Sequence, residues 1–186
     1  VLHPSTILPA VQRGIPVRIL NSLRPAGGGT RITASSYARG GELAAIASKR
    51  GVIKIDIIST RMLMAWGFLS RVFAVFEKHR TPVDVVATSE VAVSVTIDDR
   101  RHLADIVEAL SACGDVRVQH DMSIVCAVGE QLRTDPGLGA RVLGALEGLP
   151  LEMVSQGGLR KNITVVVPDA YVVAAMGRLH ARFFLR

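Results

Sequence analysis

Aromatic residues, signal-peptide features and long apolar runs are scarce or missing in this sequence. Phe, Trp and Tyr make up 4% of the residues, which leaves few rings on which the bases of single-stranded nucleic acid could stack. No apolar run approaches the roughly 20 residues that a membrane-spanning helix needs. The N-terminus lacks the basic start, apolar middle and small-residue cleavage site of a signal peptide. These absences predict a soluble, cytoplasmic protein with no membrane partner.

Patterns typical of catalysis and metal binding are also missing. Cys113 and Cys126 have neither CxxC spacing nor a histidine nearby, so they are interpreted as small buried residues. The histidines have no metal-ligand spacing, and no serine or cysteine has a recognisable activating partner. The Gly-rich segment 26–30 lacks the Lys-Ser/Thr of a phosphate-binding loop and is interpreted as a linker. We therefore expect no catalytic residue and no metal ligand.

Basic residues outnumber acidic ones, giving a formal net charge of +6. They are dispersed along the chain, which is typical of a solvated surface. The strands expected at 91–97 and 163–167 contain no aromatic residue that could stack on a base. Binding to nucleic acid is therefore not expected.

A repeat with an offset of 70 residues organises most of the chain. Residues 67–77, GFLSRVFAVFE, align without gaps on residues 137–147, GLGARVLGALE, and share Gly, Arg, Val and Glu. The same offset places residues 93–99 on residues 163–169. Two copies of one module are predicted.

Hydrophobic periods within the first copy indicate strands at 52–58, 83–87, 91–97 and 115–119, with one helix after the first strand and another after the third. The order βαββαβ is that of a ferredoxin-like unit, an antiparallel sheet with both helices on one face. Asp98 or Asp99 is expected to cap the second helix. The buried helical faces are expected at Phe68, Leu69, Val72, Phe73 and Phe76, and at Leu103, Ile106, Val107 and Leu110.

The second copy ends one strand early, after a helix opened by Asp169. The missing strand is predicted at residues 43–48, just before the first copy, so that the first module is inserted within the second. The predicted fold is α+β, with two ferredoxin-like modules in tandem. The last helix is expected to be buried through Val172, Val173, Met176 and Leu179. The predicted parts are 1–40, belonging to another domain and its linker, 41–120 for the first module and 121–186 for the second.

The connection before the first helix has the features of a binding site. Met62 and Trp66 are large apolar residues in a loop, and Gly67 frees backbone N–H groups at a helix N-terminus, which attracts a carboxylate. Asp84 and the turn 88–90 could hold an amino group, so a free amino acid would be bound at both ends. The alternative is that Met62 and Trp66 plug the edge of the sheet while Asp84 is a solvated turn residue.

Four segments together resemble the C-terminal part of aspartate kinase, including its tandem ACT domains. The resemblance covers nearly the whole chain, in order. It implies a parent enzyme that phosphorylates the β-carboxylate of aspartate with MgATP, and a regulatory region that senses an end product. The segments are VLHPSTILPAVQRGIPVRILNS, AGGGTRI, GFLSRVFAVFEKHRTPVDVVATSEVAVSVTID and EMVSQGGLRKNITVVV.

The same resemblance implies how this region would work. None of the family's catalytic residues falls in the sequence, so the region itself is expected to bind no cofactor and to be inactive alone. Its implied partners are the kinase domain of the same chain and a second copy, in a homodimer formed through the ACT modules. Its implied effector is lysine, which would give feedback inhibition. Threonine sensing, an effector-free dimerisation module and a stand-alone amino-acid-binding protein remain alternatives.

In lysine-sensitive relatives the effector lies in the first ACT module, where two modules pair. By this resemblance the backbone at 67–69 takes the effector carboxylate, and Asp84 or Glu90 provides the counter-charge for an ammonium group. The sequence departs from the pattern at Ala65, where relatives carry a small hydroxyl residue, and at Met64 and Trp66, where they carry polar or basic ones. The implied effector-binding residues are Met62, Ala65, Trp66, Gly67, Phe68, Leu69, Val83, Asp84, Thr88, Ser89 and Glu90.

Overall fold

The computed structural model describes residues 4–33, 42–60 and 66–185. They form two compact units, Val1–Gly40 and Gly41–Arg186, which are considered separately. In the described part of the chain, no helix is both long enough and apolar enough to cross a membrane.

The first unit is a helix followed by a hairpin, formed by α1 (Pro4–Gln12), β1 (Val17–Ile19) and β2 (Thr30–Ile32). The two strands pair antiparallel, so the Gly-rich segment interpreted as a linker lies in the turn of a hairpin. Gly29 has a φ of +59°, and a Cβ at this position would lie 2.3 Å from the carbonyl oxygen of Ile19. The close approach of the two strands therefore requires glycine here.

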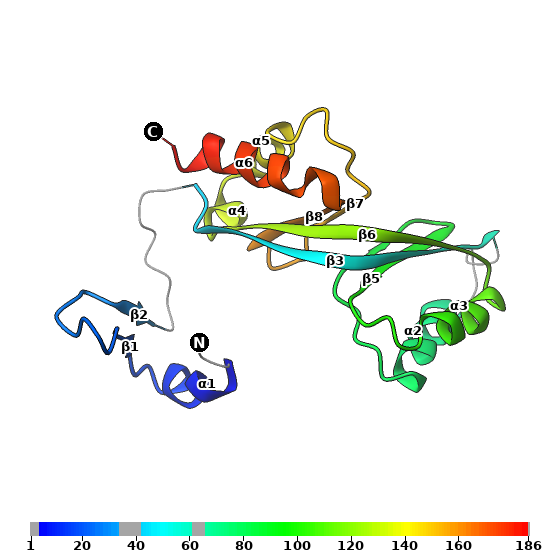
Figure 1. The fold of residues 1–186 in the computed structure, drawn as a ribbon, viewed down its shortest axis with the longest axis horizontal. Helices are drawn as coiled ribbons and strands as arrows, with labels where there is room; N and C mark the ends of the chain where they lie inside the picture. The colour runs from blue at the N-terminus through cyan, green and yellow to red at the C-terminus, as the bar shows by residue number, and fades with distance from the viewer. Residues whose placement is uncertain (1–3, 34–41, 61–65, 186) are drawn as a thin grey trace. The chain divides into compact units, whose positions relative to one another are not determined.

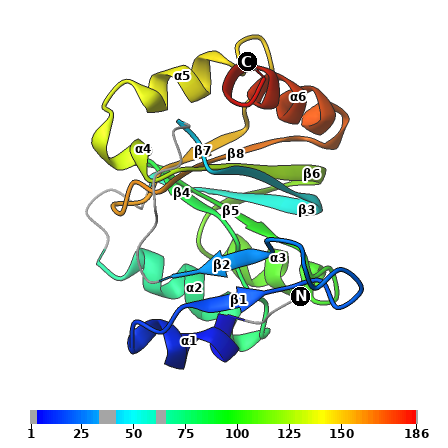
Figure 2. The ribbon, with the colours of Figure 1, turned by 90° about the vertical axis from the view of Figure 1, so that its left-hand side faces the viewer.

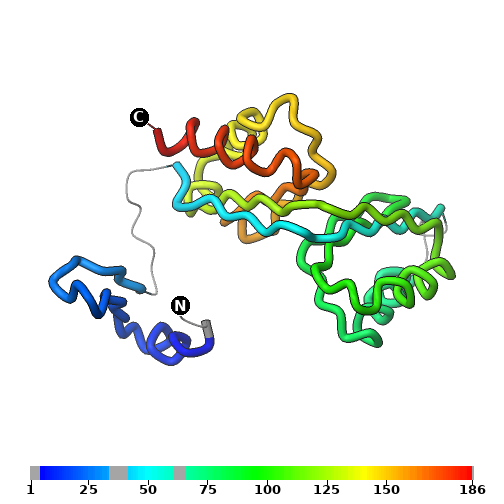
Figure 3. The backbone as a smooth tube through the Cα atoms, in the orientation of Figure 1, coloured from blue at the N-terminus to red at the C-terminus, as the bar shows by residue number. Residues whose placement is uncertain are grey.

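The second unit is built on a six-stranded antiparallel sheet with the strand order β4-β5-β3-β6-β8-β7. Its two central strands, β3 and β6, run side by side along the whole unit (Figures 1 and 3). The strands are β3 (Ala45–Ile58), β4 (Val86–Thr88), β5 (Ala92–Ile97), β6 (Asp115–Val128), β7 (Met153–Ser155) and β8 (Asn162–Pro168).

Each long central strand serves two four-stranded modules. The second half of β3 pairs with β5 and with the start of β6, whereas residues 45–49 of β3 pair with residues 124–128 of β6, next to β8. The strand needed to complete the second module thus comes from before the first module. The predicted fold, with one ferredoxin-like module inserted in the other, is confirmed.

The strands expected at 43–48 and 52–58 are one strand, β3, and the strand expected at 115–119 is the first part of the longer strand β6. The register of β3 against β6 shifts between Lys49 and Val52. Gly51 in β3 and Asp121 in β6 have φ values of 71° and 54° at this place. A local irregularity therefore turns the sheet without ending the strand, which a break in the sequence pattern does not distinguish from a loop.

The helices of the two modules cover opposite sides of the sheet (Figure 2). In α2, Phe68, Val72 and Phe76 are buried at a helical spacing of four residues. Two expected core residues are exposed, Leu69 by 41% and Val173 by 69%, because each follows a residue that already takes the inward position. The helices are α2 (Phe68–Lys78) and α3 (Leu103–Ser111) in the first module, and α4 (Gln131–Thr134), α5 (Leu138–Gly144) and α6 (Val172–Phe183) in the second.

The cap predicted for α3 is wrong. The residue at its N-cap is His102, whereas Asp98 pairs with Lys49 and Asp99 accepts hydrogen bonds from Arg101. Both carboxylates are therefore bound to basic side chains. The prediction considered only how close the two residues are to the helix in the sequence.

The sheet coils so that its outermost strands meet. Ser155 in β7 donates a hydrogen bond of 3.4 Å to the carbonyl oxygen of Val86 in β4. The side chain of Lys54, only 7% exposed, forms ion pairs with Asp56 at 3.0 Å and with Glu152, just before β7, at 3.2 Å. The modules are thus joined by an ionic contact of the buried Lys54 with the partly exposed Glu152, as well as by their shared strands.

Candidate functional site

The N-terminus of α2 presents backbone N–H groups of the kind that bind anions. Gly67, with a φ of 73°, sits at the N-cap, and none of the described side chains caps the helix there. The N–H groups of a first helical turn have no intrahelical acceptor and carry partial positive charge. A left-handed conformation costs a non-glycine residue about 1–2 kcal/mol. Gly67 therefore sets the geometry of this end while adding no side chain that would cover it.

Two side chains flank this helix end. Arg71, on the first turn of α2, donates a hydrogen bond of 3.2 Å from its guanidinium to the carbonyl oxygen of Trp66. Its guanidinium carbon lies 6.0 Å from the centroid of the Phe68 ring. Trp66 is 94% exposed, so the alternative in which it plugs the edge of the sheet is wrong for this chain taken alone. The helix end thus combines a cation with an uncovered aromatic ring.

The turn 88–90 lies at the same edge of the sheet as the connection into α2. Strands β3 and β4 both run antiparallel to β5, so they end at the same edge. The N–H of Ser59, just after β3, donates 2.8 Å to the carbonyl oxygen of Val91. Thr88, Ser89 and Glu90 are exposed there. The turn that the sequence associated with Gly67 is therefore placed close to the start of the connection that leads to it.

Asp84 lies at the other end of β4. Its N–H donates 2.9 Å to the carbonyl oxygen of Thr96, and its carboxylate pairs with Lys49 at 2.7 Å. Four residues along a strand separate Asp84 from Thr88 by about 13 Å. Val83, beside it, is half-buried against the core of the first module. The candidate residues thus form two poles, not one cluster.

Asp84 does not stand alone as a negative charge. Lys49 bridges Asp84 and Asp98, at 2.7 Å from each. Burial acts to lower the pKa of Lys49, but hydrogen bonds to the two carboxylates raise it above its usual value. The hydrogen bond from Lys49 in turn lowers the pKa of Asp98. One cation between two carboxylates leaves a net negative charge at this pole.

The second module fills the equivalent helix end with its own side chain. The repeat offset places Asp135, Gly137 and Arg141 on Ala65, Gly67 and Arg71. One carboxylate oxygen of Asp135 accepts 2.8 Å from the N–H of Gly137, and the other accepts 2.5 Å from Arg141. These two donors, Arg141 first, lower the pKa of Asp135. An internal carboxylate is thus held by one backbone amide and one guanidinium at the start of α5.

Comparisons with known proteins agree with this architecture. Residues 125–183 match the family model of an ACT domain. Aspartokinase 3, chloroplastic, of Arabidopsis thaliana is 40% identical over 99% of this chain and 35% of its own length. A solved structure assigned to the C-terminal regulatory domain of aspartate kinase from Porphyromonas gingivalis is 43% identical, with a TM-score of 0.68, over 75% of this chain and 96% of that one.

The chain belongs to the regulatory region of the aspartokinase family. Aspartokinase III of E. coli, solved in complex with lysine and aspartate, is 32% identical with a TM-score of 0.85, over 99% of this chain and 42% of that one. The chain therefore spans well under half the length of these two full aspartokinases. The family resemblance noted in the sequence is confirmed.

The predicted site residues of this aspartokinase region do not all lie together. Trp66, Gly67, Phe68 and Leu69 lie at the start of α2, while Val83 and Asp84 lie at the far end of β4. Met62 and Ala65 lie outside the described residues. Sequence reasoning missed Arg71, although the repeat aligns it with Arg141, whose contact with a carboxylate shows what an arginine at this position can bind.

Proposed function

We propose that this chain is the effector-sensing region of an aspartate kinase, an enzyme that phosphorylates the β-carboxylate of aspartate with MgATP, and that lysine bound to the first module inhibits it. The observation that carries the proposal is the start of α2, which no described side chain caps. The second module holds a carboxylate at the corresponding place, bound by an arginine and a backbone amide. A ligand carboxylate can make the same contacts in the first module with Arg71 and the amides of 67–69.

The separation of Asp84 from the turn 88–90 favours lysine over threonine. The strand between Asp84 and Thr88 covers about 13 Å. An extended lysine, with its four-carbon stem and a hydrogen bond of about 2.9 Å at each end, covers a similar span. With its α-ammonium group at the turn 88–90, such a lysine would reach the net negative pole at Asp84 with its ε-ammonium group. Threonine can satisfy the α2 end but is too short to reach Asp84.

The remaining candidate residues suit the rest of such a ligand. Glu90 is exposed in the turn at the α2 edge and forms no ion pair with any other described residue, so it can receive the α-ammonium group. Thr88 and Ser89 offer hydroxyl groups beside it. Met64 and Trp66 replace the polar residues of lysine-sensitive relatives with apolar ones. We infer that they form an apolar wall along the methylene groups of lysine, which compensates for the hydroxyl group that Ala65 does not have.

Inhibition requires the effector to favour one arrangement of the enzyme. We infer that it does so by contacting first modules of two copies in a homodimer, because Trp66 and the turn 88–90 are exposed in the single chain. Allosteric coupling of this kind is worth about 1–3 kcal/mol. The change would reach the kinase domain through the first unit and the segment that joins it to the first module.

The location of the protein is a separate prediction. The sequence predicts the cytoplasm, whereas a plant relative is named chloroplastic. The cytoplasm therefore remains a prediction.

Isothermal titration of the 186-residue chain with lysine and with threonine tests the effector, and inhibition of the full-length enzyme tests the regulatory role. We expect lysine to bind below millimolar concentration and at least ten-fold more tightly than threonine, and to inhibit. Tighter binding of threonine would refute the two-pole argument. Binding of neither would favour an effector-free dimerisation module. Binding without inhibition would favour a stand-alone amino-acid-binding protein.

A further inference from the structure

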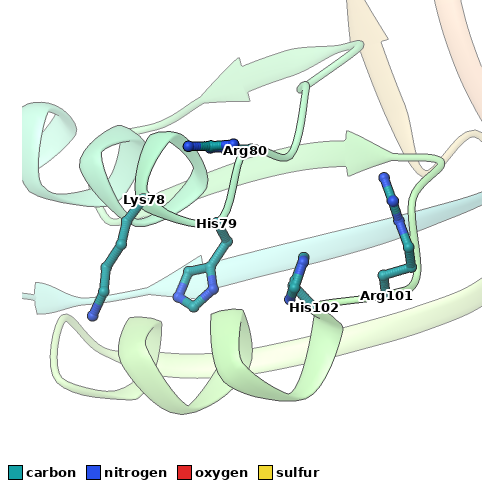
Figure 4. Close-up of a pocket in the computed structure, with 5 residues that line it drawn as sticks. All are labelled: Lys78, His79, Arg80, Arg101 and His102. Atoms are coloured by element: carbon teal, nitrogen blue, oxygen red, sulfur yellow. The ribbon is translucent and has the colours of Figure 1, made fainter.

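Two histidines and a carboxylate meet at the end of α2 that lies away from Gly67. His79 follows the last turn of α2, His102 precedes α3, and Asp105 lies in the first turn of α3. One ring nitrogen from each histidine and one carboxylate oxygen of Asp105 all lie within 4.8 Å of one another. Figure 4 shows the two imidazole rings extending from different elements into the same space.

The surroundings leave room for a bound ion. The two histidines line a surface hollow of about 330 Å³ together with Lys78, Arg80 and Arg101. The rings lie 5.8 Å apart, centroid to centroid, and are inclined by 43°. His79 is half-buried, whereas His102 and Asp105 are exposed. The cluster is thus accessible from solvent and partly held by the fold.

We propose that His79, His102 and Asp105 form a binding site for a divalent transition-metal ion, with zinc as the best match. Two imidazole nitrogens and one carboxylate oxygen are a ligand set that zinc accepts, with water completing a tetrahedron. Zinc binds such ligands at about 2.0–2.2 Å, which places the ligand atoms about 3.3 Å from one another. Magnesium prefers oxygen ligands and suits the site poorly.

The required movement is small. His102 and Asp105 are three residues apart at the start of α3, and Nδ1 of His102 is already 3.7 Å from a carboxylate oxygen of Asp105. The ligand atoms lie at most 4.8 Å apart, so reaching tetrahedral spacing needs a shift of at most about 1.5 Å. None of the three side chains is part of the buried core. Rotation of the exposed His102 and Asp105 side chains toward the half-buried His79 can therefore assemble the site without repacking the module.

The neighbouring basic residues set a limit on affinity. Arg101 is bound to Asp99 through its Nε at 3.0 Å and its Nη2 at 2.6 Å, which offsets its charge. Lys78 and Arg80 have no ion-pair partner among the described residues, and their charge opposes a dication. We therefore expect micromolar binding, weaker than that of a closed structural zinc site.

A bound ion would join the end of α2 to the start of α3 across the helical layer of the first module. Helix α2 has 11 residues and is about 16 Å long, so the ion would lie far from the helix end assigned to the amino-acid carboxylate. Metal binding would stabilise the module without occupying that site. The inference is thus independent of the proposed function.

The test measures thermal unfolding of the metal-free 186-residue chain with zinc chloride, magnesium chloride or inorganic phosphate at about 0.1–1 mM, roughly 100- to 1000-fold above a Kd of about 1 μM. We expect zinc to raise the Tm by several degrees and magnesium to leave it unchanged. The visible spectrum of added cobalt should show a tetrahedral complex. Zinc affinity should fall at least ten-fold in H79N and in H102N, and less in D105N.

The matched control is H120N, which changes an exposed histidine outside the cluster. Its zinc affinity should equal that of the unaltered chain. The proposal is overturned if zinc has no effect, if zinc affinity is the same in H79N and H102N as in the unaltered chain, or if H120N lowers it equally. Stabilisation by phosphate without any by zinc would also overturn it and would identify the hollow as an anion site.

Discussion

The two modules share one fold but treat the start of their first helix differently. In the second module Asp135 places its carboxylate on the N–H of Gly137 and on Arg141. In the first module the corresponding residue is Ala65, which has no carboxylate, and Arg71 holds only the carbonyl oxygen of Trp66 among the described residues. The first module thus lacks the internal carboxylate of the second, and we propose it for this reason as the module that binds a free amino acid.

The difference also concerns what surrounds each helix end. Arg141 is additionally bound at 2.8 Å to Glu42, in the segment that enters β3, so the helix end of the second module is tied to its neighbour strand. At the first module, Trp66 leaves an apolar ring exposed beside Gly67. Contacts within the chain thus close the helix end of the second module, whereas no described side chain caps that of the first.

The largest expected effect is a loss of stability when the ion pair that joins the two modules is removed. Lys54→Ala removes the cation held between Asp56 and Glu152, and loss of one partner of a buried ion pair costs about 3–5 kcal/mol. Because Glu152 is partly exposed, we expect a loss of about 3 kcal/mol in the free energy of unfolding. Urea denaturation measures it. The exposed Lys78→Ala is the control, and an equal loss there would contradict the role of Lys54.

A second change makes the first module resemble the second. Ala65→Asp places a carboxylate where the repeat puts Asp135, so it should occupy Arg71 and the amides of α2. Lysine binding should weaken by at least about 100-fold, equivalent to about 2.7 kcal/mol, while the fold is kept. Isothermal titration and thermal unfolding measure both. Ala65→Asn, which has no charge, should weaken lysine binding less. Unchanged lysine affinity in Ala65→Asp would show that the ligand carboxylate does not bind where Asp135 binds in the second module.

A third change removes the guanidinium alone. Arg71→Ala deletes one charge-assisted hydrogen bond to the ligand carboxylate, so lysine affinity should fall by roughly 10-fold, as expected for a contact of about 1.5 kcal/mol. Arg71→Lys keeps the charge without the planar guanidinium, so its lysine affinity should lie between that of the unaltered chain and that of Arg71→Ala. Titration of both variants provides the measurement. Full affinity in Arg71→Ala would show that the arginine does not bind the effector.

The smallest effect is a dependence on pH in the second module. The pKa of Asp135 is lowered in the folded chain, mainly by Arg141 and then by the Gly137 amide. Its stabilising contribution is therefore present above the unfolded pKa of about 3.9 and is lost as pH falls through the lower folded value. Asp135→Asn should lower the Tm at pH 7 but much less at pH 3. A difference in Tm that does not depend on pH would contradict the ionic role of Asp135.

The sequence was sufficient for the module count and the order of elements, because the repeat and the apolar spacing of residues such as Phe68, Val72 and Phe76 reflect local periodicity. The continuous strands were not predictable, since Gly51 interrupts the pattern of β3 without ending it. The pairing of Lys49 with Asp84, and the meeting of His79 with His102, join residues far apart in the chain. Such contacts follow from the folded topology, and local spacing rules cannot reveal them.

Lysine titration of the isotopically labelled chain, followed through its backbone amide resonances, tests most directly whether the open helix end of the first module is the carboxylate site. We expect saturable shifts at Gly67, Phe68 and Leu69, with Gly137 and Leu138 unaffected because Asp135 already occupies their helix end. Shifts centred on Gly137, or none at residues 67–69 at saturating lysine, would contradict the account.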